Sequence, residues 1–246
     1  MPSEEPRLEE QAISQVVHAG LSSQLDAAEE LTVDIRTNLG KAAQGKVDSV
    51  SVSGKGVTLQ NIRVQTLELQ TDRVTLNPLN ALFGNLKLSH PVDATARVVL
   101  TEADVNQAVN APAIATRIPS LELNVEGEQV TVKLQHPLTV ALPETGKIAL
   151  TGKAALSSRA ASRQVEFSVV IIPRTGDRSV SMAAFQCQPE GLTIDFIIAL
   201  MQTFKTLLEL PFIEIEGMAV RIKRLDVQVG HLTVETEAYI PDMPSL

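Results

Sequence analysis

Side chains that could bind a metal or act as nucleophiles are few and widely spaced in this chain. The histidines are His18, His90, His136 and His231, and the only cysteine is Cys187. No two histidines stand four residues apart, no HExxH motif occurs, and no second cysteine could complete a zinc ligand set. The pattern therefore predicts no metal site. It predicts that Cys187 is a small buried hydrophobic residue and not a nucleophile.

The remaining candidates for chemistry are the glycine-containing residues 53–56 and the carboxylates Asp93, Glu102 and Asp104. Residues 53–56 lack the GxxxxGK[ST] spacing of a phosphate-binding loop and lead into a strand pattern, whereas such loops lead into helices. The carboxylates fit strand and helix-capping positions. We therefore expect a protein that is not an enzyme, with no catalytic residue and no cofactor.

Composition and charge exclude further classes of function. The chain has 246 residues and a formal net charge of −8, so it is long enough to bury a sizeable core without disulfides. Acidic residues are concentrated in residues 1–30, and the remainder of the chain is only slightly acidic. Such a surface predicts that nucleic acid is not a partner, and it disfavours purely electrostatic docking on anionic membranes.

Among the elements that could position a site, the clearest pattern is that of residues 193–210, TIDFIIALMQTFKTLLEL. At 100° per residue the large apolar side chains fall on one side and the polar ones on the other, which predicts an amphipathic helix. We expect its apolar wall to face a sheet and to line an elongated apolar groove where facing side chains leave a gap. The alternative is that the wall completes a dry core. The wall residues are Phe196, Ile197, Leu200, Met201, Phe204 and Leu208.

Nearly all the rest of the chain alternates apolar and polar residues at period two, separated by turn residues, which predicts antiparallel strands. The alternation changes parity near Gly54 and Gly56, so we expect bulges or bends there that keep one face inward. His90 and His136 each precede a proline, which predicts strand ends or edges. The predicted fold class is α+β, with a long, strongly curved antiparallel sheet wrapped around amphipathic helices.

Three further helices are expected. One covers about residues 4–25, with acidic residues in its first turn, and a short one covers residues 77–84. The third opens at Thr101, with Asp104 placed to complete a cap. We expect one elongated domain over residues 1–246. A weak internal duplication is an alternative, because the strand pattern after Gly56 resembles that after Gly217.

The sequence contains no stretch of about 18 consecutive apolar residues, the length that crosses a bilayer. The first ten residues, MPSEEPRLEE, lack the basic and apolar regions of a secretory signal. These two observations predict a cytoplasmic protein, with peripheral membrane attachment as the variant.

One stretch carries a family resemblance. Residues 93–106, DATARVVLTEADVN, are similar to the signature of the LmeA-like phospholipid-binding family, formerly catalogued as a domain of unknown function. Residues 52–57 and 77–84, VSGKGV and NPLNALFG, are similar to its earlier segments, particularly in cyanobacterial members. The likeness covers most of the chain.

This resemblance implies a tubular lipid-binding fold related to the bactericidal/permeability-increasing (BPI) protein superfamily, in which acyl chains lie between a curved sheet and a helix. It implies non-enzymatic binding of phospholipid or another amphiphile, with transient membrane contact, and it makes the wall of residues 193–210 the expected lipid-binding site. The exported actinobacterial branch of the family has a leader, a feature that this sequence does not show. The alternative function is a membrane-surface or protein-interaction module with a filled core.

Overall fold

The computed structural model describes residues 11, 14–15, 17–19, 21–22, 25–42, 44–59, 61–75, 88–116, 120–125, 127–158, 162–173, 181–188, 198, 201, 213–215 and 218–241. In chain order the elements are β1 (Glu30–Arg36), α2 (Leu39–Ala42), β2 (Lys46–Leu59), β3 (Ile62–Thr75), β4 (Val92–Thr101), α4 (Glu102–Asn110), α5 (Pro112–Ala115), β5 (Leu121–Val125), β6 (Glu128–Glu144), β7 (Lys147–Ser157), β8 (Ser162–Ile172), β9 (Ser181–Gln188), β10 (Ile213–Ile215), β11 (Met218–Gln228) and β12 (His231–Ile240).

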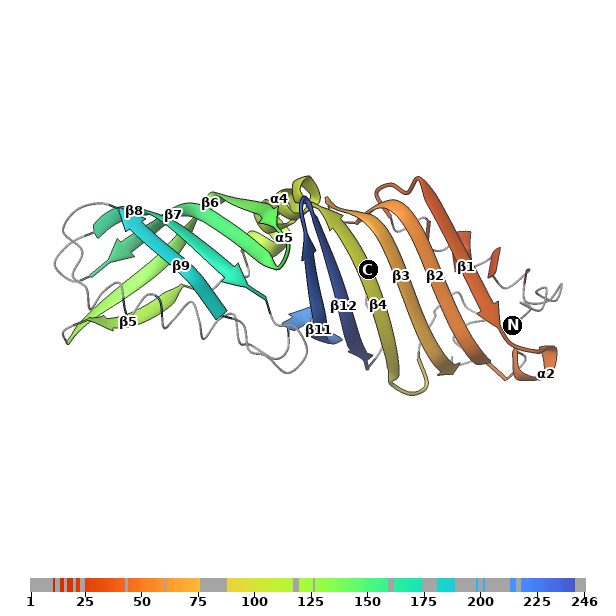
Figure 1. The fold of residues 1–246 in the computed structure, drawn as a ribbon. Coiled ribbons are helices and arrows are strands. Elements are labelled where there is room, and N and C mark those ends of the chain that lie inside the picture. The colour runs from red at the N-terminus through yellow and green to blue at the C-terminus, as the bar shows by residue number, and fades with distance from the viewer. Residues whose placement is uncertain are drawn as a thin grey trace. The chain divides into compact units, whose positions relative to one another are not determined.

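The strands form two sheets (Figure 1). The seven-stranded sheet has the order β1-β2-β3-β4-β12-β11-β10, and the five-stranded sheet has the order β5-β6-β7-β8-β9. The predicted antiparallel pairing is confirmed, and the architecture is mostly antiparallel sheet with a curled, half-barrel sheet and few helices. The wrapping of the sheet around amphipathic helices stays a prediction.

The chain divides into two compact units. The first comprises Met1–Val99, Pro211–Lys223 and Val234–Leu246, and the second comprises Leu100–Leu210 and Arg224–Thr233. The expectation of one domain, and the alternative of a weak duplication, stay predictions. Each unit is described by itself below.

In the first unit, the parity change in β2 is a bend at one glycine. Gly56 has φ +55°, and the register between β2 and β3 is the same on both sides of it. A Cβ on Gly54 would lie 2.5 Å from Cγ2 of Val57, so the Val57 side chain occupies the space above Gly54. The parity change predicted that Val57 stays on the inner face, and it does. The left-handed conformation of Gly56 turns the strand, and the register with β3 does not shift.

The outer edge of β1 meets the amino-terminal segment, of which residues 11, 14–15, 17–19 and 21–22 are helical. The Ile35 N–H donates to Oγ of Ser14 over 3.2 Å, and Nε2 of His18 lies 3.0 Å from the Leu31 carbonyl oxygen. Side chains of the helix therefore satisfy backbone groups that an edge strand would otherwise expose. The predicted helix over about residues 4–25 is supported at these positions, and residues 4–10 lie outside the described part, as does the predicted short helix of residues 77–84.

In the second unit, α4 begins with the predicted cap. Oγ1 of Thr101 accepts a hydrogen bond from the Asp104 N–H at 3.1 Å, and Oδ2 of Asp104 accepts from the Thr101 N–H at 2.9 Å. The two residues form a reciprocal capping box, and Asp104 is 3% exposed. This carboxylate therefore has the capping role that its sequence position predicted.

One side of α4 also binds the backbone of β6. Oε2 of Glu102 accepts from the Leu142 N–H at 2.7 Å. Asn106 makes two bonds to Val140, accepting from its N–H at 2.8 Å and donating to its carbonyl at 2.7 Å. Asn110 repeats this pair with Leu138, both at 2.8 Å. We call Glu102, Asn106 and Asn110 the amide ladder.

The amide ladder works because two periods nearly match. Four residues of helix rise about 6.0 Å and two residues of strand rise about 6.6 Å. Every fourth side chain of α4 therefore lies beside the backbone of every second residue of β6. β5 pairs with β6 only from Glu128 to Val132, and the ladder covers the stretch beyond it. The side chains of α4 thus take the place of a neighbouring strand.

Both prolines lie where a strand end or edge was predicted. Pro91 directly precedes β4. Pro137 lies inside β6, beyond the stretch that pairs with β5, so β6 is the edge strand of its sheet there. The register with β7 shifts between Gln135 and Thr139, and the strand continues past the proline.

Candidate functional site

The inner face of the five-stranded sheet carries a well-buried apolar core, with partly buried side chains such as Leu134, Leu150 and Phe185 packed against it. Val132 is 1% exposed and Val169 is 0% exposed. A Cβ on Gly152 would lie 2.6 Å from Cδ2 of Leu138 and 3.3 Å from the ring of Phe167, so neighbouring side chains already fill the gap that the glycine leaves. We call this surface the closed face; its buried members are Leu123, Val130, Val132, Leu138, Ala154, Leu156, Val165, Phe167, Val169 and Ile171.

The inner face of the seven-stranded sheet is only half buried over its middle strands. Val52 pairs with Leu69 and Leu69 with Ala96, so these three side chains form one row across β2, β3 and β4. The next row has Gly54, Leu67 and Val98. We call this surface the half-open face; its half-buried apolar members are Val50, Val52, Leu67, Leu69, Ala96 and Val98.

One polar side chain lies in the same face. Thr71 pairs with Val50 on one side and with Ala94 on the other, in the row next to that of Leu69. Its Oγ1 atom is buried and has no hydrogen-bond partner, alone among the side chains of the described residues. A buried hydroxyl without a partner is unusual and costs free energy, so the atom is a candidate contact for a bound molecule.

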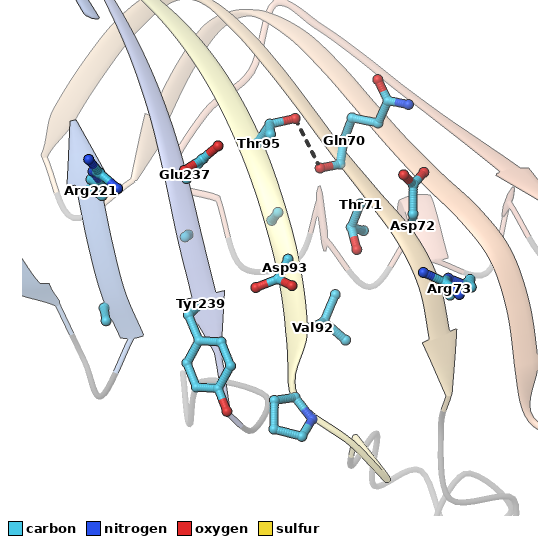
Figure 2. A pocket seen from close by; sticks show the side chains of 14 residues that line it. Gln70, Thr71, Asp72, Arg73, Val92, Asp93, Thr95, Arg221, Glu237 and Tyr239 are labelled. Atoms are coloured by element: carbon cyan, nitrogen blue, oxygen red, sulfur yellow. Dashed lines mark hydrogen bonds between the residues drawn. The ribbon is translucent and has the colours of Figure 1, made fainter. Parts of the chain in front are cut away.

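Two hollows lie beside strands of the two sheets. The larger, of about 910 Å³, is bordered by exposed charged and polar side chains of β3, β4, β11 and β12, among them Asp72, Arg73, Asp93, Arg221 and Tyr239 (Figure 2). Figure 2 also shows the 3.5 Å hydrogen bond from Oγ1 of Thr95 to the Gln70 carbonyl at its rim. Thr71, Val92 and Ala94 also line this hollow, so residues that alternate between both sides of β3 and β4 border it.

The smaller hollow, of about 520 Å³, lies on the β6–β9 sheet. Exposed polar residues border it, including Thr139, Thr151, Lys153, Glu166 and Gln186, and Nζ of Lys153 lies 3.1 Å from Oε1 of Glu166. The linings of both hollows mix polar and apolar residues, among them Phe167 and Cys187 in the smaller hollow. The half-open face has no charged member and is therefore the better candidate for holding apolar material.

The predicted wall of residues 193–210 is almost entirely outside the described part. Phe196, Ile197, Leu200, Phe204 and Leu208 are not described. Met201 is helical and 37% exposed. The wall therefore stays a prediction.

His136, His231 and Cys187 contact groups of the surrounding fold. Nδ1 of His136 lies 3.1 Å from Oδ1 of Asn110 in the amide ladder, and Nδ1 of His231 lies 3.3 Å from the Val229 carbonyl oxygen. Cys187 pairs with Phe167 and packs against the closed face, and its desolvation there raises the pKa of the thiol. A raised pKa disfavours the nucleophilic thiolate.

The residues that the structure describes contain no group of three or more His, Cys, Asp or Glu side chains arranged to hold a metal ion. Within the same part of the chain, no helix has both the length and the apolar character that crossing a membrane requires.

Comparison with known families decides the relationship. The family model described as LmeA-like phospholipid-binding matches residues 6–237 of the chain. The chain belongs to the LmeA-like phospholipid-binding family. A search of curated proteins and a search of solved structures gave no match.

The stretch that carried the family resemblance has a structural role in this chain. Residues 93–106 comprise most of β4 and the first half of α4, including Thr101 and Asp104 of the capping box and Glu102 and Asn106 of the amide ladder. The partial burial of the half-open face could not be predicted from the sequence, because half-buried and fully buried strand faces have the same alternation of apolar and polar residues. The orphaned Thr71 hydroxyl gives no sequence signal at all.

Proposed function

We propose that the chain binds phospholipid or a similar amphiphile without catalysing a reaction, in an apolar groove between a curved sheet and an amphipathic helix. The observation that carries the proposal is membership of the LmeA-like phospholipid-binding family over residues 6–237. The tubular, BPI-like arrangement, the likeness to cyanobacterial members and the peripheral, cytoplasmic location are parts of the same proposal.

The physical basis is the transfer of alkyl chains out of water. Each methylene group buried contributes about 0.8 kcal/mol, so a two-chain lipid binds well without a charged anchor. An apolar sheet face that is not filled by its own side chains offers such a surface. In this proposal the predicted apolar side of residues 193–210 is a further surface of this kind.

Organic extraction tests the proposal. The protein is purified without detergent, extracted, and the extract analysed by mass spectrometry against a mock purification. We expect phospholipid in a near-stoichiometric amount. Vesicle flotation without extractable lipid would instead favour a membrane-surface module with a filled core, and lysolipid or free fatty acid accumulating during incubation would show a hydrolase.

The wall of residues 193–210 has its own test. The double variant Leu200→Asp/Phe204→Asp places charge on the predicted apolar side, and Gln202→Asp/Thr206→Asp places the same charge on the polar side. We expect the first pair to abolish lipid retention and the second to preserve it. Retention by a folded Leu200→Asp/Phe204→Asp protein would exclude this wall.

A further inference from the structure

We infer that the acyl chains lie on the half-open face of the first unit, with the ester end of the lipid at the Thr71 hydroxyl. This inference rests on the proposed function and names where in the fold the lipid is held. The occupant is an alkyl chain because, apart from Thr71, every half-buried member of the face is aliphatic.

The two inner faces differ in the space that they leave. On the closed face, Leu138 and Phe167 fill even the position opposite Gly152, and the core valines have almost no exposure. On the half-open face, Val52, Leu69 and Ala96 form a row that the chain covers only in part. A contiguous apolar surface that the chain only partly buries is a candidate binding groove, and here the family supplies the chemistry of the ligand.

The polar groups of the same strands point away from this face. Ser53 and Gln70, the neighbours of Val52 and Leu69, are exposed, and so are Thr95 and Arg97 on either side of Ala96. Three rows of the face span about 13 Å along the strands and its three strands about 10 Å across. The face is therefore an apolar strip wide enough for alkyl chains side by side, with no charge in it.

Thr71 gives the strip a direction. It lies at one end, in the row of Val50 and Ala94, while Leu67 and Val98 lie at the other. Its buried Oγ1 has no partner in the chain, and a hydroxyl donor of this kind is satisfied by an acceptor such as an ester carbonyl. The lipid then lies with its glycerol ester at Thr71 and its alkyl chains running toward Leu67 and Val98.

Photo-crosslinking locates the lipid directly. The full chain is incubated with vesicles of phosphatidylcholine that carries a diazirine in one acyl chain, irradiated and digested, and the labelled peptides are mapped. We expect labels within residues 50–71 and 94–98. Labels confined to residues 130–171 or 193–210 would overturn the inference while leaving the proposed function intact. An absence of any lipid, in both this experiment and the extraction, would overturn both.

Matched variants test the face by substitution. Val52→Asp and Leu69→Asp place charge on the half-open face, and Ser53→Asp and Gln70→Asp place it one residue away, on the exposed side of the same strands. We expect the first pair to lower lipid retention at least about tenfold and the second to change it less than about twofold. Ala96→Trp fills the face without charge and is expected to lower retention similarly, which covers the case in which aspartate prevents folding. Full retention by folded Leu69→Asp or Ala96→Trp protein would refute the assignment.

Thr71→Val separates a ligand contact from a merely buried hydroxyl. The substitution keeps the shape and removes the donor, so we expect lipid affinity to fall roughly threefold to tenfold while the lipid-free protein becomes no less stable. Unchanged affinity would show that the hydroxyl does not contact the lipid. Thr95→Val, at an exposed position of the neighbouring strand, is the control and is expected to change neither quantity.

Discussion

The two apolar sheet faces of this protein differ in burial although both come from the same alternation of residues. The closed face includes Phe167 and Ile171, and Leu138 and Phe167 converge over Gly152. The half-open face has no member larger than leucine and includes Ala96. The comparison teaches that alternation determines which side of a strand is apolar, whereas side-chain volume and the overlying elements determine whether that side becomes a core or a surface.

Truncating one large side chain on each face should give the largest difference. Phe167→Ala leaves a cavity in the closed face and should lower the free energy of unfolding by about 3–5 kcal/mol. Leu69→Ala should lower it by only about 1–2 kcal/mol, because a leucine that is not fully buried loses less burial. Urea unfolding of the lipid-free proteins measures both. Equal losses would show that the two faces are equally well packed.

Removing the amide ladder tests whether the stability of the second unit depends on the contacts of α4 with β6. In Asn106→Leu/Asn110→Leu the side chains keep their approximate size but can no longer bond to the Val140 and Leu138 backbones. Leaving such groups unpaired should cost about 2 kcal/mol or more.

Hydrogen exchange gives the local measurement. The amides of Leu138 and Val140 should lose protection, while the amides that join β2 and β3 in the first unit keep theirs. Ala103→Leu introduces the same side chain at an exposed position of α4 and should change stability by less than about 0.5 kcal/mol. Protection of Leu138 and Val140 unchanged by the double substitution would mean that the ladder contributes little.

Sequence reasoning predicted the parts of this fold that depend on local physical chemistry. Alternation predicted the antiparallel strands, and the spacing of Thr101 and Asp104 predicted the cap that the structure contains. It did not find the amide ladder, because polar residues four apart on a helix usually form a solvated side. Asn106 and Asn110 differ from such residues only through β6, which lies about thirty residues further along the chain.

The same reasoning was least complete where a strand departs from regular geometry. A proline after His136 predicted a strand end or an edge, and β6 has no strand partner on its β5 side at Pro137. The shift of register that lets β6 continue to Glu144 was not predicted. The candidate site shows the same limit. Val52 and Leu69 have the alternation of a core, and only the three-dimensional arrangement shows that they are not fully buried.

The smallest expected effect compares thiols on the two faces. Cys187 packs against the closed face, where desolvation raises its pKa, so its thiol should react slowly with iodoacetamide. In Leu69→Cys/Cys187→Ser the single thiol lies on the half-open face and should react at least about threefold faster. Added phospholipid should slow the second reaction and leave the first unchanged. Equal rates, or protection of Cys187 by lipid, would contradict the comparison.

The raised pKa of the Cys187 thiol also predicts how the stability of the protein depends on pH. Because the pKa of Cys187 is higher in the folded protein than in the unfolded chain, its contribution to stability is complete below the ordinary thiol pKa of about 8.5. That contribution is lost as the pH rises through the raised pKa of the folded state, since unfolding then releases a proton. Urea unfolding between pH 7 and 10 should therefore show a fall in stability that Cys187→Ser reduces. An identical fall in both proteins would show that the thiol is solvated, and the closed face would then be open at its β9 edge.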